Sequence, residues 1–265
     1  MIIIGERINS SRQKVAEAIN QQDATFIQNE ARMQAETGAD YLDVNAGVFG
    51  EDEAKYLEWL IRVVQEASDK PLCIDSSNPS VFAAALKLCQ GRAFLNSVMA
   101  RKEDIDAVIP LLKEYPCNIV AMCLEGPEAE FEGTSRLAIA DRIIGMFTGH
   151  GIELDRVYLD PVIKPVATDS NAGIIALNTI QQVIEKYPQV HTVCGVSNIS
   201  FGLPQRKLIN GVFAAMAIER GLDALLVDPC DQKLMTDVFA ANLLSGKDES
   251  CLGYIKAYRG GKLAG

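Results

Sequence analysis

Histidine is scarce in this chain, and its cysteines are scattered. His150 and His191 are the two histidines in 265 residues, and both are predicted to lie just ahead of strands, away from the strand ends where barrel enzymes place their chemistry. The sequence therefore argues against a histidine-based nucleophile triad and against a histidine-ligated metal. None of the seven cysteines forms a Cys-x-x-Cys pair, so neither a disulfide framework nor a zinc knuckle is indicated.

Long apolar runs and clusters of basic residues are also missing. Residues 1–7 hold only a short apolar run before charges arrive, whereas a signal peptide needs roughly 7–15 apolar residues and a membrane span about 20. The formal net charge is −10, from 35 acidic and 25 basic residues, and no basic face is available to neutralise nucleic-acid phosphates. We therefore expect a cytoplasmic protein without a nucleic-acid or membrane partner.

Short apolar segments alternate with longer amphipathic ones along the whole chain. The short segments are apolar without alternation, as is typical of parallel strands buried on both faces. The predicted strands are 2–5, 41–45, 72–75, 93–97, 119–123, 157–160, 192–197 and 224–228. The predicted helices are 54–67, 81–88, 103–115, 134–147, 173–187 and 211–220.

This alternation predicts an α/β protein with a single (β/α)8 TIM barrel. Eight strands in 265 residues give about 33 residues per unit, which suits a closed eight-stranded barrel. We expect residues 1–265 to form one domain. An open doubly wound sheet is the alternative, but it usually carries a glycine-rich phosphate turn after its first strand, and residues 5–9 are not such a turn.

Carboxylates and carboxamides follow the predicted strands. Because barrel enzymes place their chemistry at the carboxyl ends of the strands, we expect these side chains to gather around one mouth. A carboxylate accepts two N–H bonds from a 2-amino-4-oxo-pyrimidine edge, and Asn donates and accepts on neighbouring atoms. Three of the carboxylates, Asp43, Asp75 and Asp160, could instead hold Mg²⁺, although we expect no metal. The polar strand-end residues include Asp43, Asn45, Asp75, Asn96, Asp160 and Asn198.

Six short motifs, each at a predicted strand end, carry a resemblance that covers essentially the whole chain. They are Ile-Gly-Glu-Arg-Ile-Asn (4–9), Leu-Asp-Val-Asn (42–45), Cys-Ile-Asp-Ser (73–76), Leu-Asn-Ser (95–97), Leu-Asp-Pro (159–161) and Gly-Val-Ser-Asn-Ile-Ser (195–200), followed by Arg206 and Asn210. With these motifs the sequence resembles the pterin-binding methyltransferases, in particular the methyltetrahydrofolate:corrinoid/iron–sulfur protein type.

The resemblance implies a reaction and its substrates. A methyl group would move between N5 of tetrahydrofolate or 5-methyltetrahydrofolate and the cobalt of a corrinoid (cobalamin) carried by a partner protein, by SN2 displacement. Members of the family commonly form homodimers, so the resemblance also implies a homodimer. The direction of transfer is not written in the residues.

The resemblance also implies roles for individual residues. Asn198 would hydrogen-bond N5 and act in catalysis, and Arg206 would support the folate or the loop after the seventh strand. Phe201 stands where the family has a polar residue, which departs from the family's hydrogen-bond pattern in that loop. Asp43 and Asn45 would contact the ligand or support the residues that do. The pterin ring itself would be held by Asp75, Asn96 and Asp160.

Other interpretations stay open at this point. The same residues could serve the backbone, as helix caps, turn formers or a surface ion pair. A barrel enzyme similar to dihydropteroate synthase is one alternative function, but Asn198 follows Ser197 where that enzyme has basic residues, and Asp228-Pro229 stands where it has an anion site. A non-catalytic folate-binding protein that docks a corrinoid partner is the other.

Overall fold

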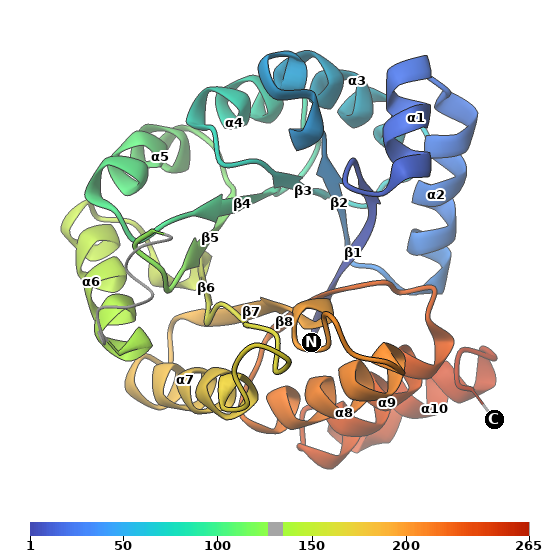
Figure 1. The fold of residues 1–265 in the computed structure, drawn as a ribbon, viewed down its shortest axis with the longest axis vertical. Helices are drawn as coiled ribbons and strands as arrows, with labels where there is room; N and C mark the ends of the chain where they lie inside the picture. The colour runs from blue at the N-terminus through green and yellow to red at the C-terminus, as the bar shows by residue number, and fades with distance from the viewer. Residues whose placement is uncertain (127–134, 265) are drawn as a thin grey trace.

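Eight parallel strands close into a barrel, as the sequence predicts (Figure 1). The structure is a computed structural model that describes residues 1–126 and 135–264. The strands pair in chain order, and β1 pairs with β8 as well as β2, which closes the sheet. The strands are β1 (Ile2–Asn9), β2 (Tyr41–Asn45), β3 (Leu72–Asp75), β4 (Phe94–Val98), β5 (Asn118–Met122), β6 (Val157–Asp160), β7 (His191–Gly195) and β8 (Ala224–Val227).

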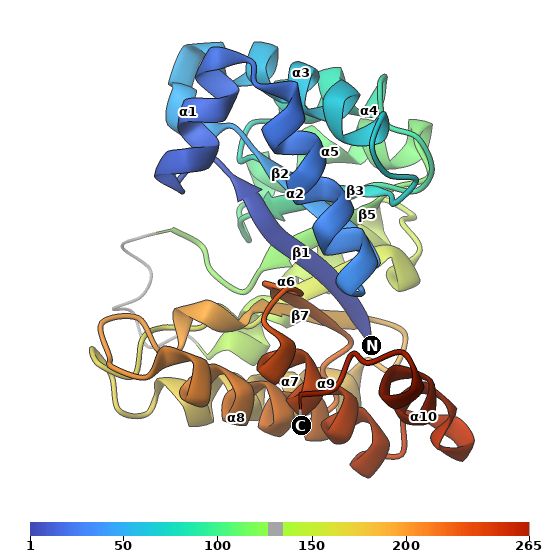
Figure 2. The same cartoon turned by 90° about the vertical axis from the view of Figure 1, so that its right-hand side faces the viewer.

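Helices surround the barrel in both views of the molecule (Figures 1 and 2). They are α1 (Gln13–Gln21), α2 (Ala24–Thr37), α3 (Glu53–Gln65), α4 (Pro79–Leu86), α5 (Lys102–Glu114), α6 (Arg136–Gly149), α7 (Ala172–Lys186), α8 (Arg206–Glu219), α9 (Gln232–Leu244) and α10 (Leu252–Arg259). The helices predicted from the sequence with explicit bounds correspond to α3 to α8, and no bounds were predicted for α1, α2, α9 and α10. Position 134, the first residue of the helix predicted at 134–147, lies outside the described residues. Among the residues that the structure describes, no helix is both long and apolar enough to cross a membrane.

Two strands differ from their predicted bounds in ways that shape the mouth. β1 continues to Asn9 instead of ending at residue 5, with an irregular register against β2 between Gly5 and Ile8. β7 ends at Gly195, and the chain turns into a 3-10 helix, η4 (Val196–Asn198). Asn198 therefore sits on a tight turn above the sheet rather than directly at a strand end.

The interior of the barrel is filled at its amino-terminal end. Tyr41, Phe94 and Tyr158 meet edge to face, with ring centroids 4.7 and 4.6 Å apart, a geometry that aromatic pairs prefer. His191 stacks on Tyr158 at this same end, and His150 follows the last turn of α6 and bonds to an exposed carboxylate. The predicted position of both histidines, away from the mouth, is confirmed.

Candidate functional site

A cavity of about 630 Å³ opens at the carboxyl ends of β1, β7 and β8. It contains most of the polar groups that follow those strands. Its lining includes Glu6, Asn9, Arg12, Gly195, Ser197, Asn198, Arg206, Asn210, Leu226 and Asp228. A cavity of this size falls in the range of small-molecule sites.

A second, much smaller space of about 20 Å³ lies inside the barrel. Asn96 and Asp160 line it, together with Cys73. Gly195 and Leu226 line both spaces, so the smaller space lies next to the mouth cavity. Asn96 and Asp160, with Asp75 in register beside Asn96, are called the polar floor below. The structure thus brings Asn96, Asp160 and Asn198 to one connected region, as expected from the sequence.

Polar residues of the first four strands stand at the same height. Asn9 pairs in register with Asn45, Asn45 with Asp75, and Asp75 with Asn96. Since registered neighbours in a sheet project to the same face, these side chains form one polar row across β1 to β4. Asp75 accepts a hydrogen bond from Asn9 Nδ2 at 3.3 Å.

Asp75 is available to a ligand because another residue caps the helix that follows. Asn78 accepts the Ser80 backbone N–H at 3.0 Å at the start of α4, so the interpretation of Asp75 as a helix cap is wrong. Burial raises the pKa of Asp75 to about 6, opposed by the Asn45 amide and assisted by the charge of Glu53. At neutral pH the group is mainly ionised.

Asp160 forms the turn after β6 and also lines the small space inside the barrel. Its Oδ1 accepts the Val162 backbone N–H at 2.7 Å, which fixes the turn after β6. Its other oxygen forms no hydrogen bond within the part of the chain that the structure describes. Burial raises the pKa of Asp160 to about 6, against the lowering effects of the Val162 bond and the nearby Arg136 charge.

Asn45 serves the backbone around the mouth. It donates to the Asp75 carbonyl at 3.3 Å and accepts from Ser10 Oγ at 2.6 Å and from the Gly47 N–H at 3.1 Å. These bonds join the ends of β1, β2 and β3. The geometry favours the supporting role for Asn45 over direct contact with a ligand.

Asp43 lies one layer below the row and is completely buried. Among residues 1–126 and 135–264, neither of its oxygens has a partner in ordinary hydrogen-bond geometry, although the Cys73 thiol and the Asn96 amide interact with the carboxyl and lower its pKa in part. Burial, followed by the charge of Asp75, raises the pKa of Asp43 well above its ordinary value. Complete burial below the row favours the supporting role for Asp43.

The magnesium interpretation finds no matching geometry. Within residues 1–126 and 135–264, no three His, Cys, Asp or Glu side chains gather as a cation site would require. Asp43, Asp75 and Asp160 stand on β2, β3 and β6, and β4 and β5 separate the last two.

Arg206 holds the loop that carries Asn198. Its Nη2 donates to the Ser197 carbonyl at 2.7 Å and its Nε to Ser200 Oγ at 3.1 Å, and its guanidinium lies 5.8 Å from the centre of the Phe201 ring. Arg206 forms no salt bridge with the described residues, so it is not a surface ion pair. Asn198 is exposed in the cavity, and no described residue bonds to its side chain.

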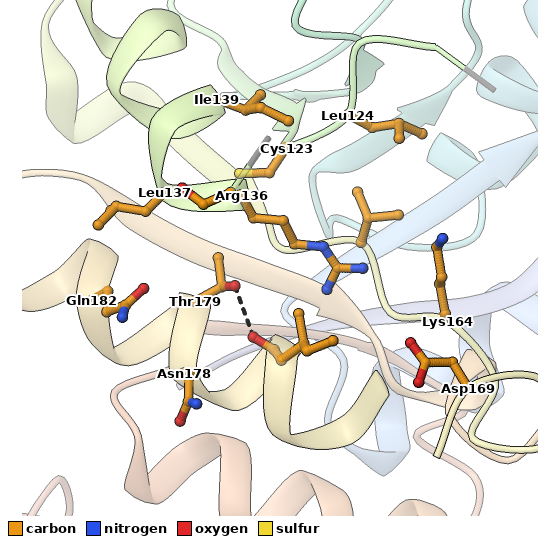
Figure 3. Close-up of a pocket in the computed structure, with 13 residues that line it drawn as sticks. Cys123, Leu124, Arg136, Leu137, Ile139, Lys164, Asp169, Asn178, Thr179 and Gln182 are labelled. Atoms are coloured by element: carbon orange, nitrogen blue, oxygen red, sulfur yellow. Dashed lines mark hydrogen bonds between the residues drawn. The ribbon is translucent and has the colours of Figure 1, made fainter. Parts of the chain in front are cut away.

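A third cavity, of about 380 Å³, lies behind Asp160 between α6 and α7 (Figure 3). Arg136 extends toward its middle, and Lys164 and Asp169 lie across from it. Cys123, another lining residue, donates its backbone N–H to the Asp160 carbonyl at 2.8 Å. This cavity shares no lining residue with the mouth cavity, so we leave it outside the candidate site.

A family model described as "Pterin binding enzyme" matches residues 5–228. This span contains the whole polar row, the floor and the Asn198 loop. The chain belongs to the pterin-binding enzyme family. The resemblance inferred from the six motifs is therefore confirmed at the level of the family.

Relatives of the chain extend the comparison. It is 35% identical over 265 residues to the methylcorrinoid:tetrahydrofolate methyltransferase of Eubacterium limosum, and the match covers 99% of this chain and 98% of that protein. It is 29% identical over 242 residues to methionine synthase of Mycobacterium tuberculosis, a match that covers 86% of this chain and 20% of that longer protein.

Solved structures agree on the fold. The dihydropteroate synthase of Coxiella burnetii in complex with pteroic acid superposes with a TM-score of 0.70 at 16% identity, over 93% of this chain and 94% of that one. The Xanthomonas albilineans dihydropteroate synthase in complex with 7,8-dihydropteroate gives a TM-score of 0.68 at 19% identity, over 94% of each chain. At this level of identity the likeness concerns the barrel alone.

Glu6 is a strand-end residue to which the sequence assigned no individual role. It is largely buried under the mouth cavity and accepts a hydrogen bond from Ser197 Oγ at 2.9 Å. It belongs to the first motif, and the structure places it within β1, which continues to Asn9. The next residue, Arg7, turns away and pairs with Glu30 and Asp228 at 2.6 and 2.9 Å.

Proposed function

We propose that this enzyme transfers a methyl group between N5 of tetrahydrofolate and the cobalt of a corrinoid on a partner protein, by SN2 displacement. The observation that carries the proposal is the full-length similarity to a methylcorrinoid:tetrahydrofolate methyltransferase, together with a polar floor that opens into the mouth cavity. The same site catalyses both directions, because a catalyst lowers one shared barrier.

The floor suits the edge of a pterin ring. Asp75 and Asp160, ionised at neutral pH, would accept N–H bonds from the 2-amino group and the neighbouring ring nitrogen, and Asn96 would complete the pattern. An ionised carboxylate forms stronger hydrogen bonds than a neutral acceptor. The ring would then be fixed with N5 facing the mouth, which reduces the orientation cost of the reaction.

Asn198 is proposed as the group that acts on N5. An amine nitrogen is a poor leaving group unless positive charge on it is stabilised, by a proton or by a strong hydrogen bond. Asn198 stands exposed in the cavity on a loop whose backbone is fixed by Arg206, and its side-chain amide has no competing partner among the described residues, so it is free to bond N5. Such a bond strengthens as charge changes on N5, and it acts on turnover more than on binding.

A second copy of the chain is the proposed occupant of an apolar face on α7 and α8. A groove of about 350 Å³ lies between these helices, and Ile174, Leu208, Val212 and Met216 are exposed around it. The face offers both a groove and protruding side chains, which is what an isologous two-fold contact requires. Val212→Glu should convert the dimer to a monomer in sedimentation experiments; a wild-type monomer would contradict the proposal.

The proposed location is the cytoplasm. All seven cysteines are free thiols, and Cys73, Cys117, Cys123 and Cys194 are buried, as expected of a protein that functions where thiols stay reduced. We also propose that residues 1–265 act as one domain, because one closed barrel runs from β1 to β8.

The reaction can be tested directly with free cobalamin. Purified protein is mixed anaerobically with 5-methyltetrahydrofolate and cob(I)alamin, and the visible spectrum is followed for methylcob(III)alamin; the reverse reaction starts from methylcobalamin and tetrahydrofolate. Turnover in both directions supports the proposal. Folate binding without transfer, to cobalamin or to a corrinoid protein, would favour a non-catalytic binding protein. A requirement for a pterin diphosphate would favour a condensing enzyme.

A further inference from the structure

Three carboxyl groups line the mouth cavity, and one of them differs from the others. Asp228 and Asp231 each form an ion pair with a basic residue, at 2.9 and 3.1 Å. Glu6 accepts a hydrogen bond from Ser197 Oγ and forms no ion pair with the residues described here. A carboxylate held by a cation gains a proton with difficulty, whereas a carboxyl held by a hydroxyl can change its protonation state readily.

We propose that Glu6 is a further catalytic residue, which takes the proton from folate N5 during methyl transfer and returns it in the reverse reaction. This inference rests on the proposed function. Glu6 lies in β1 and Ser197 in the turn after β7, and Ser197 directly precedes Asn198. The carboxyl and the proposed N5 donor therefore line the same cavity from neighbouring positions.

Methyl transfer leaves N5 with a proton to lose in one direction and a proton to gain in the other, and Glu6 lines the cavity where that proton can be exchanged. When methyl moves from cobalt to folate, the N5 lone pair forms the new N–C bond, and the Co–C bonding pair stays on cobalt, which is reduced from Co(III) to Co(I). N5 then carries one proton too many, and the Glu6 carboxylate accepts it. In the opposite direction protonated Glu6 donates to N5, the N5–C electron pair stays on nitrogen, and the methyl group bonds to Co(I).

The surroundings of Glu6 suit an acid–base role. Burial raises its pKa, the Ser197 hydrogen bond and the charge of Arg12 lower it, Asp228 raises it and Arg206 lowers it. The buried Asp43 also lies within electrostatic reach. A general acid–base group works best when its pKa lies near the operating pH.

The test compares Glu6→Gln with wild type over pH 5 to 9, in the cobalamin assay and in folate binding. We expect kcat to fall about 100-fold in Glu6→Gln, with the folate Kd unchanged within about threefold. The change of kcat with pH that comes from the titration of Glu6 in wild type should be absent from this variant. Glu6→Asp should keep part of the rate. Ser197→Ala removes a bond that stabilises the ionised form, so its pH profile should move to higher pH. Asp106→Asn removes a carboxylate that is paired with Lys102 on α5, outside the cavity, and should keep the wild-type profile.

The outcomes separate this proposal from the proposed function. A wild type that transfers methyl to no corrinoid overturns both. A wild type that turns over while Glu6→Gln keeps the same rate and pH profile overturns the role of Glu6 alone. A loss of folate affinity with an unchanged kcat in Glu6→Gln would also overturn it, because that pattern identifies a binding residue. Folding of the variant is checked by its folate affinity and thermal unfolding.

Discussion

The two ends of the barrel interior are built from the same strands but do opposite things. At the amino-terminal end the inward side chains are apolar and fully packed, including Phe94 and Tyr158. Two residues further along the same strands stand Asn96 and Asp160, which line the small space of about 20 Å³ inside the barrel. Because side chains alternate across a strand, a step of two residues keeps the same inward direction. Each of these strands therefore supplies one side chain to the packed aromatic layer of Tyr41, Phe94 and Tyr158, called the plug below, and one to the polar floor.

The packed end of the barrel stabilises the folded state, whereas the polar end lowers its stability. The plug buries aromatic surface, which stabilises the folded state. The floor keeps carboxyl groups in surroundings that raise the pKa values of Asp75 and Asp160 to about 6, so their ionised forms are held at a cost in folding free energy. Substitutions in the plug should therefore lower stability, and substitutions in the floor should raise it while they impair function.

The largest expected effect is on the stability of the plug. Phe94→Ala removes a fully buried ring and should lower the free energy of unfolding by about 3–5 kcal/mol, measured by urea denaturation. Phe201→Ala is the matched control; its side chain is 64% exposed, and we expect a change of about 0.5 kcal/mol or less. Similar losses for both variants would show that the plug does not carry the stability assigned to it.

At the mouth, the largest expected effect is on turnover. Asn198→Ala should reduce kcat by about 100-fold to 1000-fold, as for other hydrogen bonds that strengthen in a transition state. Folate affinity, measured by fluorescence titration, should change by about threefold or less because the ring is held by the floor. Asn29→Ala, on the exposed surface of α2, is the control. A fall in affinity with an unchanged kcat would place Asn198 in ground-state binding.

A third effect has opposite signs for stability and binding. Asp160→Asn removes a carboxyl whose pKa is raised to about 6. Below about pH 4 the group is protonated in both the folded and the unfolded states, so the variant should match wild type there. As pH rises to 6, the unfolded state loses its proton first and wild type becomes relatively less stable. At pH 8 the variant should be about 1–3 kcal/mol more stable.

The same substitution should weaken folate binding, because an amide replaces one acceptor of the pterin edge. In wild type, affinity should fall as pH drops through about 6 and the floor carboxylates become protonated. Asp141→Asn is the control of opposite sign: Lys186 and Tyr187 lower the pKa of this exposed carboxyl, so its loss should not stabilise the fold. Destabilisation of Asp160→Asn at pH 8 would contradict the account of the floor.

The barrel could be predicted from the sequence because each buried parallel strand is a short, continuous apolar segment that is recognised from its own residues. Asp75, Asn96 and Asp160 could be placed at one mouth for the same reason, since parallel strands end on the same side. No individual role could be assigned to Glu6 from the sequence, because its contact with Ser197 joins positions that are 191 apart in the chain. The helices α1 and α2 lie between two predicted strands, but no bounds were predicted for them.

The smallest expected effect on kcat comes from Arg206, which holds the loop after β7 that carries Asn198. Arg206 bonds two acceptors at once, the Ser197 carbonyl and Ser200 Oγ, and Ser200 in turn donates to Asn210 Oδ1 at 2.6 Å. A lysine keeps the charge but not the planar fork that reaches both acceptors. Arg206→Lys should therefore lower kcat by roughly 3-fold to 10-fold, through looser placement of Asn198. Combined with Asn198→Ala it should cause little further loss, because it acts through that residue. Fully multiplicative losses in the double variant would mean that Arg206 contacts the folate itself.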